Sequence, residues 1–153
     1  MVSFNQKETS LLQDAKKNEE LCIKKYNSYA NQAQDAQLKQ LLTQLAQQEQ
    51  QHLDSINQLL AGQLPSMGGG QQQPQGQQPQ QAQGGPTNQN DSVLCEDQLA
   101  TEKYVSSAYN TSIFEFRDAN VRQILNHIQK EEQEHGEKLY NYMASHGMYT
   151  VPQ

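Results

Sequence analysis

The sequence DAQLKQLL at residues 35–42 returns, with conservative changes, as DANVRQIL at residues 118–125. The displacement between these two stretches also places EQQH at residues 49–52 on EQEH at residues 132–135, with no gap between the two matches. Repetition at a fixed displacement indicates two copies of one supersecondary unit. The chain is therefore predicted to contain two similar halves.

Each half is expected to be a helical hairpin. Apolar or small residues recur at helical spacing on both sides of Asp35 and, in the second copy, on both sides of Asp118. An Asp at these positions suits the N-cap of the helix that follows. We expect the second helix of each hairpin to end near Gly62 or Gly147. One hairpin alone would leave its apolar stripe exposed, so the sequence predicts an all-α, four-helix bundle.

Residues 62–90 differ in composition from the rest of the chain. They contain seven of the nine Gly and four of the five Pro, and Gln fills much of the remainder. A segment of this composition is typical of a disordered linker. We therefore expect a first hairpin at residues 1–61, a linker at 62–90 and a second hairpin at 91–153, with both hairpins in one bundle domain.

Composition excludes several classes of protein. The length of 153 residues suits one compact domain, and the net charge of −6 argues against nucleic acid as the main partner. No apolar run approaches the roughly 20 residues that span a bilayer. The N-terminus lacks the basic and apolar segments of a secretory signal. Two cysteines are too few for a disulfide framework, so we expect synthesis in a reducing cytoplasm.

Polar residues replace apolar ones at certain positions of each predicted stripe. Within each hairpin, a Glu in the first helix and a Glu and a His in the second lie at about the same number of residues from the turn. In an antiparallel pair of helices, these three side chains should therefore lie at the same height along the bundle. Four carboxylates buried without partners would each cost several kcal/mol. The candidate site residues are Glu19, Glu49, His52, Glu102, Glu132 and His135.

This set of residues predicts a dimetal site. One Glu from each of two helices and Glu-x-x-His from each of the other two is the ligand set of ferritin-like di-iron and di-manganese proteins. Carboxylate and imidazole ligands suit Fe or Mn. We therefore expect a ferritin-like bundle that holds two Fe or Mn ions, with Glu49 and Glu132 as bridging ligands. The alternative is a loosely packed bundle, penetrated by water, whose polar seam binds nothing.

Several other residues receive ordinary structural interpretations. His127 and His146 lie outside the Glu-x-x-His pattern and are expected at the surface. Glu131 has no acidic counterpart in the first half and is expected on a solvated face. Tyr26 and Tyr109, which are equivalent in the repeat, are expected to pack in the core and not to act as radical sites.

The C-terminal sequence carries a family resemblance. LYNYMASHGMY at residues 139–149 resembles the C-terminal signature of the spore coat protein F family, in which a Tyr-Met pair precedes a Gly and a terminal aromatic residue. DANVRQIL, followed ten residues later by His135, resembles the last helical hairpin of that family. The resemblance covers residues 92–153 best and reaches the first hairpin through the repeat.

The resemblance implies a ferritin-like fold and a place in the coat of the endospores of Gram-positive spore formers. We expect other spore coat proteins as partners, and a homo-oligomer is left open. The first functional hypothesis is a structural or assembly component that carries the dimetal site. The alternative is a dimetal redox enzyme, similar to a peroxidase, catalase or ferroxidase, that protects the spore. A third hypothesis is a bundle that the metal stabilises without turnover.

Overall fold

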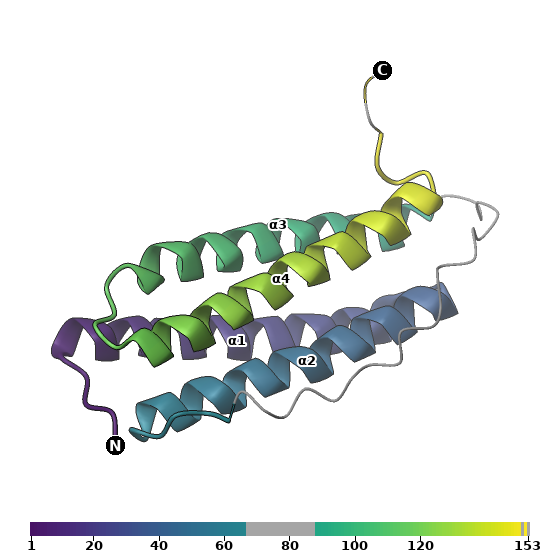
Figure 1. The fold of residues 1–153 in the computed structure, drawn as a ribbon. Helices are drawn as coiled ribbons and strands as arrows, with labels where there is room; N and C mark the ends of the chain where they lie inside the picture. The colour runs from purple at the N-terminus through teal and green to yellow at the C-terminus, as the bar shows by residue number, and fades with distance from the viewer. Residues whose placement is uncertain (67–87, 151, 153) are drawn as a thin grey trace.

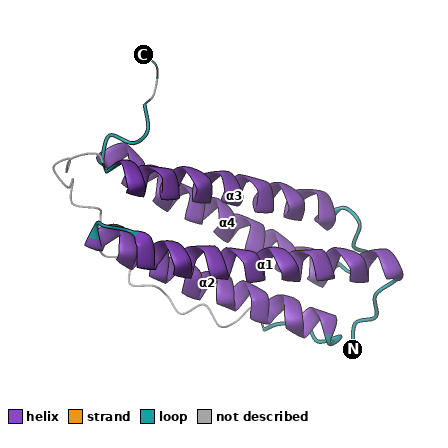
Figure 2. Ribbon diagram, turned by 180° about the vertical axis from the view of Figure 1, so that it is seen from behind, coloured by secondary structure: helices purple, strands orange, loops and turns teal. Residues whose placement is uncertain are grey.

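The computed structural model describes residues 1–66, 88–150 and 152. All regular structure in these residues is helical, and the four helices lie side by side as a bundle (Figures 1 and 2). The predicted all-α, four-helix fold is therefore confirmed. The helices are α1 (Gln6–Gln32), α2 (Ala36–Leu60), α3 (Gln89–Ile113) and α4 (Ala119–Ser145).

Each helix begins at a side chain that accepts backbone N–H groups of the first turn. Asn5 and Glu8 form a reciprocal pair at the start of α1, each side chain accepting the other's backbone N–H at 2.8 Å. Asp35 and Asp118 are the N-caps of α2 and α4, as expected. Asn88 caps α3 by accepting the backbone N–H of the third residue of the helix.

The ends of α2 and α4 depend on glycine. Gly62 has a φ of 77° and Gly147 a φ of 67°, a left-handed conformation that other residues rarely adopt. At Gly62 the N-terminus also approaches closely, because the backbone N–H of Val2 donates to the Gly62 carbonyl at 2.9 Å. A Cβ atom on Gly62 would lie 2.9 Å from the Met1 side chain. The N-terminus is thereby fixed against the end of α2.

The two hairpins are joined between opposite ends of the bundle. The end of α2 lies beside the N-terminus, whereas the start of α3 lies at the turn between α1 and α2 (Figure 1). Residues 67–87 of the expected linker lie outside the described residues. Helix α3 begins at Gln89, two residues before the expected start of the second hairpin, because Asn88 provides its N-cap.

Equivalent acidic residues tie each hairpin to the turn of the other. Glu8 accepts the backbone N–H of Arg117 at 2.9 Å and its Nη2 at 3.0 Å, in the turn between α3 and α4. Asp91, the counterpart of Glu8 in the repeat, accepts the backbone N–H groups of Gln34 and Asp35 at 2.9 Å each. Hydrogen bonds from Arg117 lower the pKa of Glu8 to about 2. These contacts give the bundle its approximate two-fold arrangement.

One expectation about the C-terminal end of α4 is wrong. His146 is buried, because its ring stacks on Tyr142 with centroids 4.0 Å apart, and its Nδ1 lies 2.8 Å from the Tyr142 carbonyl oxygen. The chain turns back at Gly147, just after the helix ends, so His146 faces the bundle and not solvent.

The core is a continuous apolar layer between the four helices, interrupted near the middle by the polar cluster described below. No helix in the described residues is both long and apolar enough to cross a membrane. The largest fully buried apolar side chains are Tyr26, Phe116, Leu12, Leu38, Leu42, Leu45, Ile56, Leu59, Leu125, Ile128, Leu139 and Met143.

Candidate metal centre

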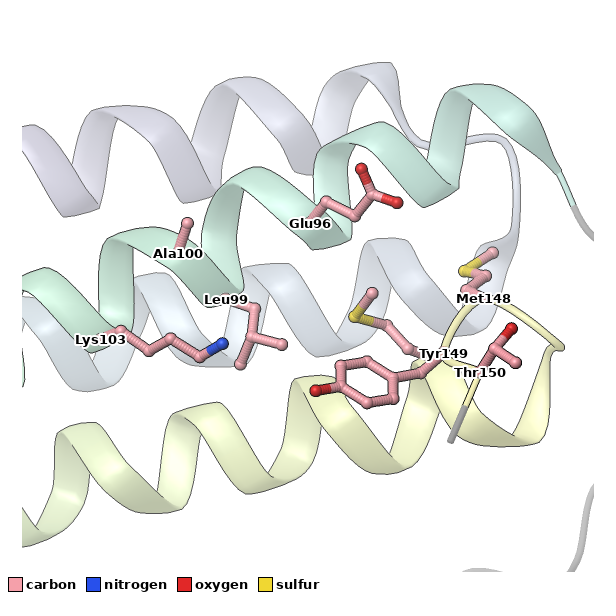
Figure 3. Close-up of a pocket in the computed structure, with 8 residues that line it drawn as sticks. Glu96, Leu99, Ala100, Lys103, Met148, Tyr149 and Thr150 are labelled. Carbon is pink, nitrogen blue, oxygen red and sulfur yellow. The ribbon is translucent and has the colours of Figure 1, made fainter. Parts of the chain in front are cut away.

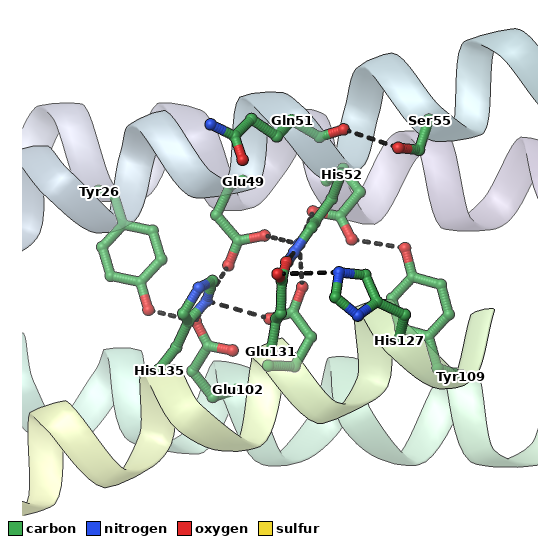
Figure 4. A network of polar contacts seen from close by, with 12 residues as sticks. Tyr26, Glu49, Gln51, His52, Ser55, Glu102, Tyr109, His127, Glu131 and His135 are labelled. Atoms are coloured by element: carbon green, nitrogen blue, oxygen red, sulfur yellow. Dashed lines mark hydrogen bonds and ion pairs between the residues drawn. The ribbon is translucent and has the colours of Figure 1, made fainter. Parts of the chain in front are cut away.

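The structure brings the six candidate site residues together at mid-height in the bundle. Helices α1 and α3 each supply one Glu, and helices α2 and α4 each supply a Glu and a His (Figure 4). None of these residues is more than 2% exposed. Their placement on the buried face follows from the helical spacing of each apolar stripe. The residues are Glu19, Glu49, His52, Glu102, Glu132 and His135.

The cluster contains two overlapping groups of four ligand atoms. In each group the oxygens and the ring nitrogen all lie within 4.8 Å of one another. The displacement that relates the two halves of the sequence converts one group into the other. Glu49 and Glu132 belong to both groups. These two residues are the ones that the sequence predicts to bridge two ions. The groups are Glu19, Glu49, His52 and Glu132, and Glu49, Glu102, Glu132 and His135.

Both histidines direct Nδ1 at the carboxylates. Nδ1 of His52 lies 2.9 Å from Glu132 Oε1 and 3.2 Å from Glu49 Oε2. Nδ1 of His135 lies 3.0 Å from Glu49 Oε1 and 3.6 Å from Glu102 Oε1. The two rings stack with centroids 5.5 Å apart and an interplanar angle of 17°. Each imidazole can therefore offer the same nitrogen to an ion bound among the carboxylates.

Two tyrosines hold the outer carboxylates across the interface between hairpins. The Tyr109 hydroxyl donates to Glu19 Oε1 at 2.5 Å, and the Tyr26 hydroxyl donates to Glu102 Oε1 (Figure 4). Both rings are buried, as expected for core residues. Sequence reasoning missed their hydrogen bonds, because each partner belongs to the other hairpin. The nearest signal in the sequence is that each Tyr follows the Glu of its own helix by seven residues.

Electrostatics show that the metal-free cluster retains protons near neutral pH. Burial raises the pKa of Glu49 to about 7 and that of Glu102 to about 7. For His135 burial acts in the opposite direction, but hydrogen bonds to Glu102, Glu132 and Glu49 raise the pKa to about 11. Protonated groups thus offset part of the carboxylate charge. A divalent cation would displace these protons.

Three buried carboxylate oxygens support the fit of a cation. Oε2 of Glu19, Glu102 and Glu132 accepts no hydrogen bond from any residue that the structure describes. A buried acceptor without a partner costs about 1–3 kcal/mol, and more when charged. Two divalent cations would supply the missing partners and balance four carboxylates. The donor set is thus chemically suited to the pair of ions that the sequence predicts.

The expectation that Glu131 lies on a solvated face is wrong. Its side chain is 31% exposed, and its Oε2 lies 2.5 Å from Nε2 of His52. Its Oε1 lies 3.0 Å from Nε2 of His127, whose side chain is 55% exposed as expected (Figure 4). Although Glu131 is adjacent to Glu132 in the sequence, it faces α2, where His52 completes its contact.

A cleft between α3 and α4 reaches the cluster from one side. It has a volume of about 350 Å³, and both Glu102 and Glu132 line it. Small side chains leave this space, since Ser106, Ser107 and Gly136 lie on its walls. The cleft therefore brings open space next to the helical positions of Glu102 and Glu132, although both residues stay buried.

The same groove is hollowed again nearer the C-terminus (Figure 3). This pocket of about 310 Å³ shares Leu99 and Lys103 with the first cleft. Met148 and Tyr149 line its far end, and the Tyr149 ring packs edge-on against Tyr140 with centroids 4.9 Å apart. The terminal aromatic residue therefore covers part of the groove and leaves the metal-ligand candidates untouched.

Comparison with known proteins finds relatives of the second half of the chain. Residues 90–152 match the Coat F domain. The uncharacterized protein YusN of Bacillus subtilis (strain 168) is 37% identical over 62 residues, which are 40% of this chain and 56% of that protein. The chain thus spans just over half the length of this curated relative. The expected resemblance to the spore coat protein F family is confirmed.

A solved structure supports the fold over nearly the whole chain. The crystal structure of a two-domain protein from Anabaena variabilis, which contains dj-1/thij/pfpi-like and ferritin-like domains, matches with a TM-score of 0.72. The match covers 97% of this chain and 40% of that protein, at 15% sequence identity. The hairpin that matches the Coat F domain and the hairpin that precedes it in the chain together have a ferritin-like bundle fold.

Proposed function

We propose that the bundle binds two Fe or Mn ions in the buried cluster. Glu49 and Glu132 bridge the ions, Glu19 and His52 complete one position, and Glu102 and His135 complete the other. The observation that carries this proposal is the pair of overlapping four-ligand groups, in which three buried carboxylate oxygens accept no hydrogen bond from the residues that the structure describes.

The protein's own residues would orient the ligands before an ion arrives. Tyr26 and Tyr109 each donate to one oxygen of an outer carboxylate, Glu102 or Glu19, and the second oxygen of each accepts no hydrogen bond from the described residues. Such outer hydrogen bonds fix the orientation of ligands and commonly change metal affinity by about 10–100-fold. Burial excludes water, so charge balance between ions and carboxylates should decide how tightly the ions are held.

The Coat F match supports a place for the protein in the endospore coat. We propose that the chain is synthesised in the cytoplasm and joins other spore coat proteins as a structural or assembly component. Its metal centre would then reinforce the bundle, because binding free energy at a site that exists only in the folded state adds to folding stability.

A redox role is the second candidate, and the cleft between α3 and α4 favours it. Bound Fe or Mn would supply one-electron chemistry toward peroxide or dioxygen. The chain's contribution would be a path of small residues, Ser106, Ser107 and Gly136, that leads to Glu102 and Glu132. This candidate covers the peroxidase, catalase and ferroxidase-like activities.

Metal reconstitution tests the proposal directly. Metal-free protein is incubated anaerobically with Fe(II) and separately with Mn(II), passed through gel filtration, and analysed for metal per chain. We expect about two ions per wild-type chain, and none after Glu49→Ala with Glu132→Ala. Glu134→Ala is the matched control, because Glu134 is an exposed acid on α4 whose ion pair with Lys130 spans 3.7 Å.

The outcomes separate the candidate functions. Wild-type protein that retains neither metal would make the cluster a polar seam and leave the coat-structural role alone. Protein that retains both ions but consumes neither added hydrogen peroxide nor dioxygen above the metal-free background would contradict the redox role and leave the metal-stabilised bundle. Consumption of peroxide that depends on bound metal would favour the enzyme.

A further inference from the structure

The surroundings of the two histidines break the repeat at one position. Glu131, which contacts Nε2 of His52 at 2.5 Å, corresponds to Gln48 in the first half of the repeat. Gln48 Oε1 is buried and accepts no hydrogen bond from the described part of the chain. The two histidines therefore differ in their surroundings. A carboxylate contacts Nε2 of His52, whereas the equivalent position on the other side carries an amide that accepts no hydrogen bond from the described residues.

The next residue outward differs as well. His127, which lies 3.0 Å from the second oxygen of Glu131, corresponds to Gln44. On the α4 side of the bundle, three polar groups in contact with one another thus run from solvent to a candidate ligand, namely His127, Glu131 and His52 (Figure 4).

This difference has a consequence for metal binding. When Nε2–H of His52 donates to a carboxylate, the ring is fixed with Nδ1 free to bind a cation, and the carboxylate increases the basicity of that nitrogen. A neutral amide oxygen is a weaker acceptor and adds no charge. Glu131 also brings one more negative charge close to the His52 position, which attracts a cation further.

We propose that the two metal positions are inequivalent. The position formed by Glu19 and His52 fills first and binds more tightly, and Glu131 is the positioning residue that creates the difference. This inference rests on the proposed dimetal function. It differs from it because the same six ligands could also hold two ions with equal affinity.

Titration of metal-free protein with Mn(II), followed by the electron paramagnetic resonance signal of free Mn(II), measures both affinities. Wild-type protein should bind two ions in two resolved steps. Glu131→Gln should weaken the first step by about 10–100-fold, as expected for loss of an outer partner, and leave the second step nearly unchanged. Gln48→Glu should strengthen the second step, and the double swap Glu131→Gln with Gln48→Glu should exchange the order of filling.

Two further variants assign the steps to positions. Glu19→Gln should remove the tight step, whereas Glu102→Gln should remove the weak one. Glu134→Gln is the control, because it removes an exposed acid from the same helix and should change neither step. A merely structural role of Glu131 would lower the thermal midpoint without affecting one binding step selectively, so each variant is also melted in EDTA.

The results distinguish the inference from the proposal beneath it. No Mn(II) uptake by wild-type protein would overturn the dimetal function itself. Uptake of two ions with equal affinity, or two steps that Glu131→Gln leaves unchanged, would overturn the inequivalence alone. If Glu131→Gln fails to fold, Gln48→Glu decides, because an unchanged second step in that variant contradicts the assigned role of the carboxylate.

Discussion

The two hairpins share their candidate ligands but differ in what surrounds them. Between α3 and α4, the residues Ser106 and Gly136 leave a cleft, whereas the equivalent positions of the first hairpin carry Ile23 and Leu53. The carboxylate of Glu131 contacts His52, and its counterpart in the first hairpin, Gln48, carries an amide. A duplicated hairpin can therefore keep two-fold symmetry in the ligands while the residues that surround them diverge.

The largest expected effect comes from removing metal from both positions and changing the pH. In the metal-free protein Glu49 and Glu102, one from each hairpin, have a pKa of about 7. Between pH 4.5 and 7 the folded state therefore binds more protons than the unfolded state, so the free energy of unfolding falls as the pH rises. His135, with a pKa of about 11, stabilises the fold fully below 6.5 and loses that contribution as the pH rises toward 11.

Melting in EDTA at pH 5, 7 and 9 measures this dependence. Since one pKa unit corresponds to about 1.4 kcal/mol, we expect the free energy of unfolding of the metal-free protein to fall by several kcal/mol from pH 5 to 9. Below pH 4.5 the sign reverses, because the contribution of Glu8, with a pKa of about 2, is lost as the pH falls. Saturating Mn(II) should give the opposite slope above pH 5, since binding releases protons. A metal-free midpoint that rises from pH 5 to 9 would contradict this account.

The next effect compares the two buried tyrosines. Tyr26→Phe removes the donor to Glu102, and Tyr109→Phe removes the donor to Glu19. Each leaves a buried carboxylate oxygen without its hydrogen bond, at a cost of about 1–3 kcal/mol. If the two tyrosine–carboxylate hydrogen bonds are equivalent, Tyr26→Phe and Tyr109→Phe should lower the free energy of unfolding, measured with urea, by the same amount.

Tyr29→Phe is the matched control for both tyrosines. Tyr29 is half-buried, and its hydroxyl donates to Asp97 Oδ2 at 2.7 Å, outside the cluster. Its loss should cost less because water can replace the hydroxyl. Equal losses of unfolding free energy in all three variants would show that the hydrogen bonds in the cluster stabilise the fold no more than the one outside it.

The repeat made the ligand positions predictable for a physical reason. A residue's position on a helix decides whether it faces the core, and helical periodicity is visible in the sequence. Glu49 and His52 interrupt an apolar stripe, so their burial could be inferred before the structure was seen. The caps at Asp35 and Asp118 were predictable in the same way, because the hydrogen bonds that define them are local.

Contacts between the hairpins were not predictable from the same pattern. Glu131 lies beside the stripe, and only the packing of α4 against α2 brings it to His52. The partners of Tyr26 and Tyr109 likewise depend on which helices become neighbours. His146 was misplaced because it follows the last regular turn of α4, where periodicity no longer reports direction. The metal ions themselves stay a prediction.

The smallest expected effect tests the cleft that distinguishes the second hairpin. Gly136 lies inside α4, where glycine costs about 0.5–1 kcal/mol relative to alanine. A Cβ atom at this position would meet Leu99 Cδ1 at 3.8 Å, an ordinary contact. Gly136→Ala should therefore raise the free energy of unfolding by up to about 1 kcal/mol, measured by urea unfolding in EDTA. A lower stability would show that the cleft wall has no room for a methyl group.

Gly136→Leu tests whether the cleft matters for metal entry, because it places in the second hairpin the residue found at the equivalent position of the first, Leu53. The larger side chain would project into the cleft beside Glu102 and Glu132. If ions reach the cluster by this route, Mn(II) uptake should slow while the final metal content stays the same as in Gly136→Ala. An unchanged uptake rate would place the entry elsewhere, and the exposed His127 and partly exposed Glu131 then become the route to test.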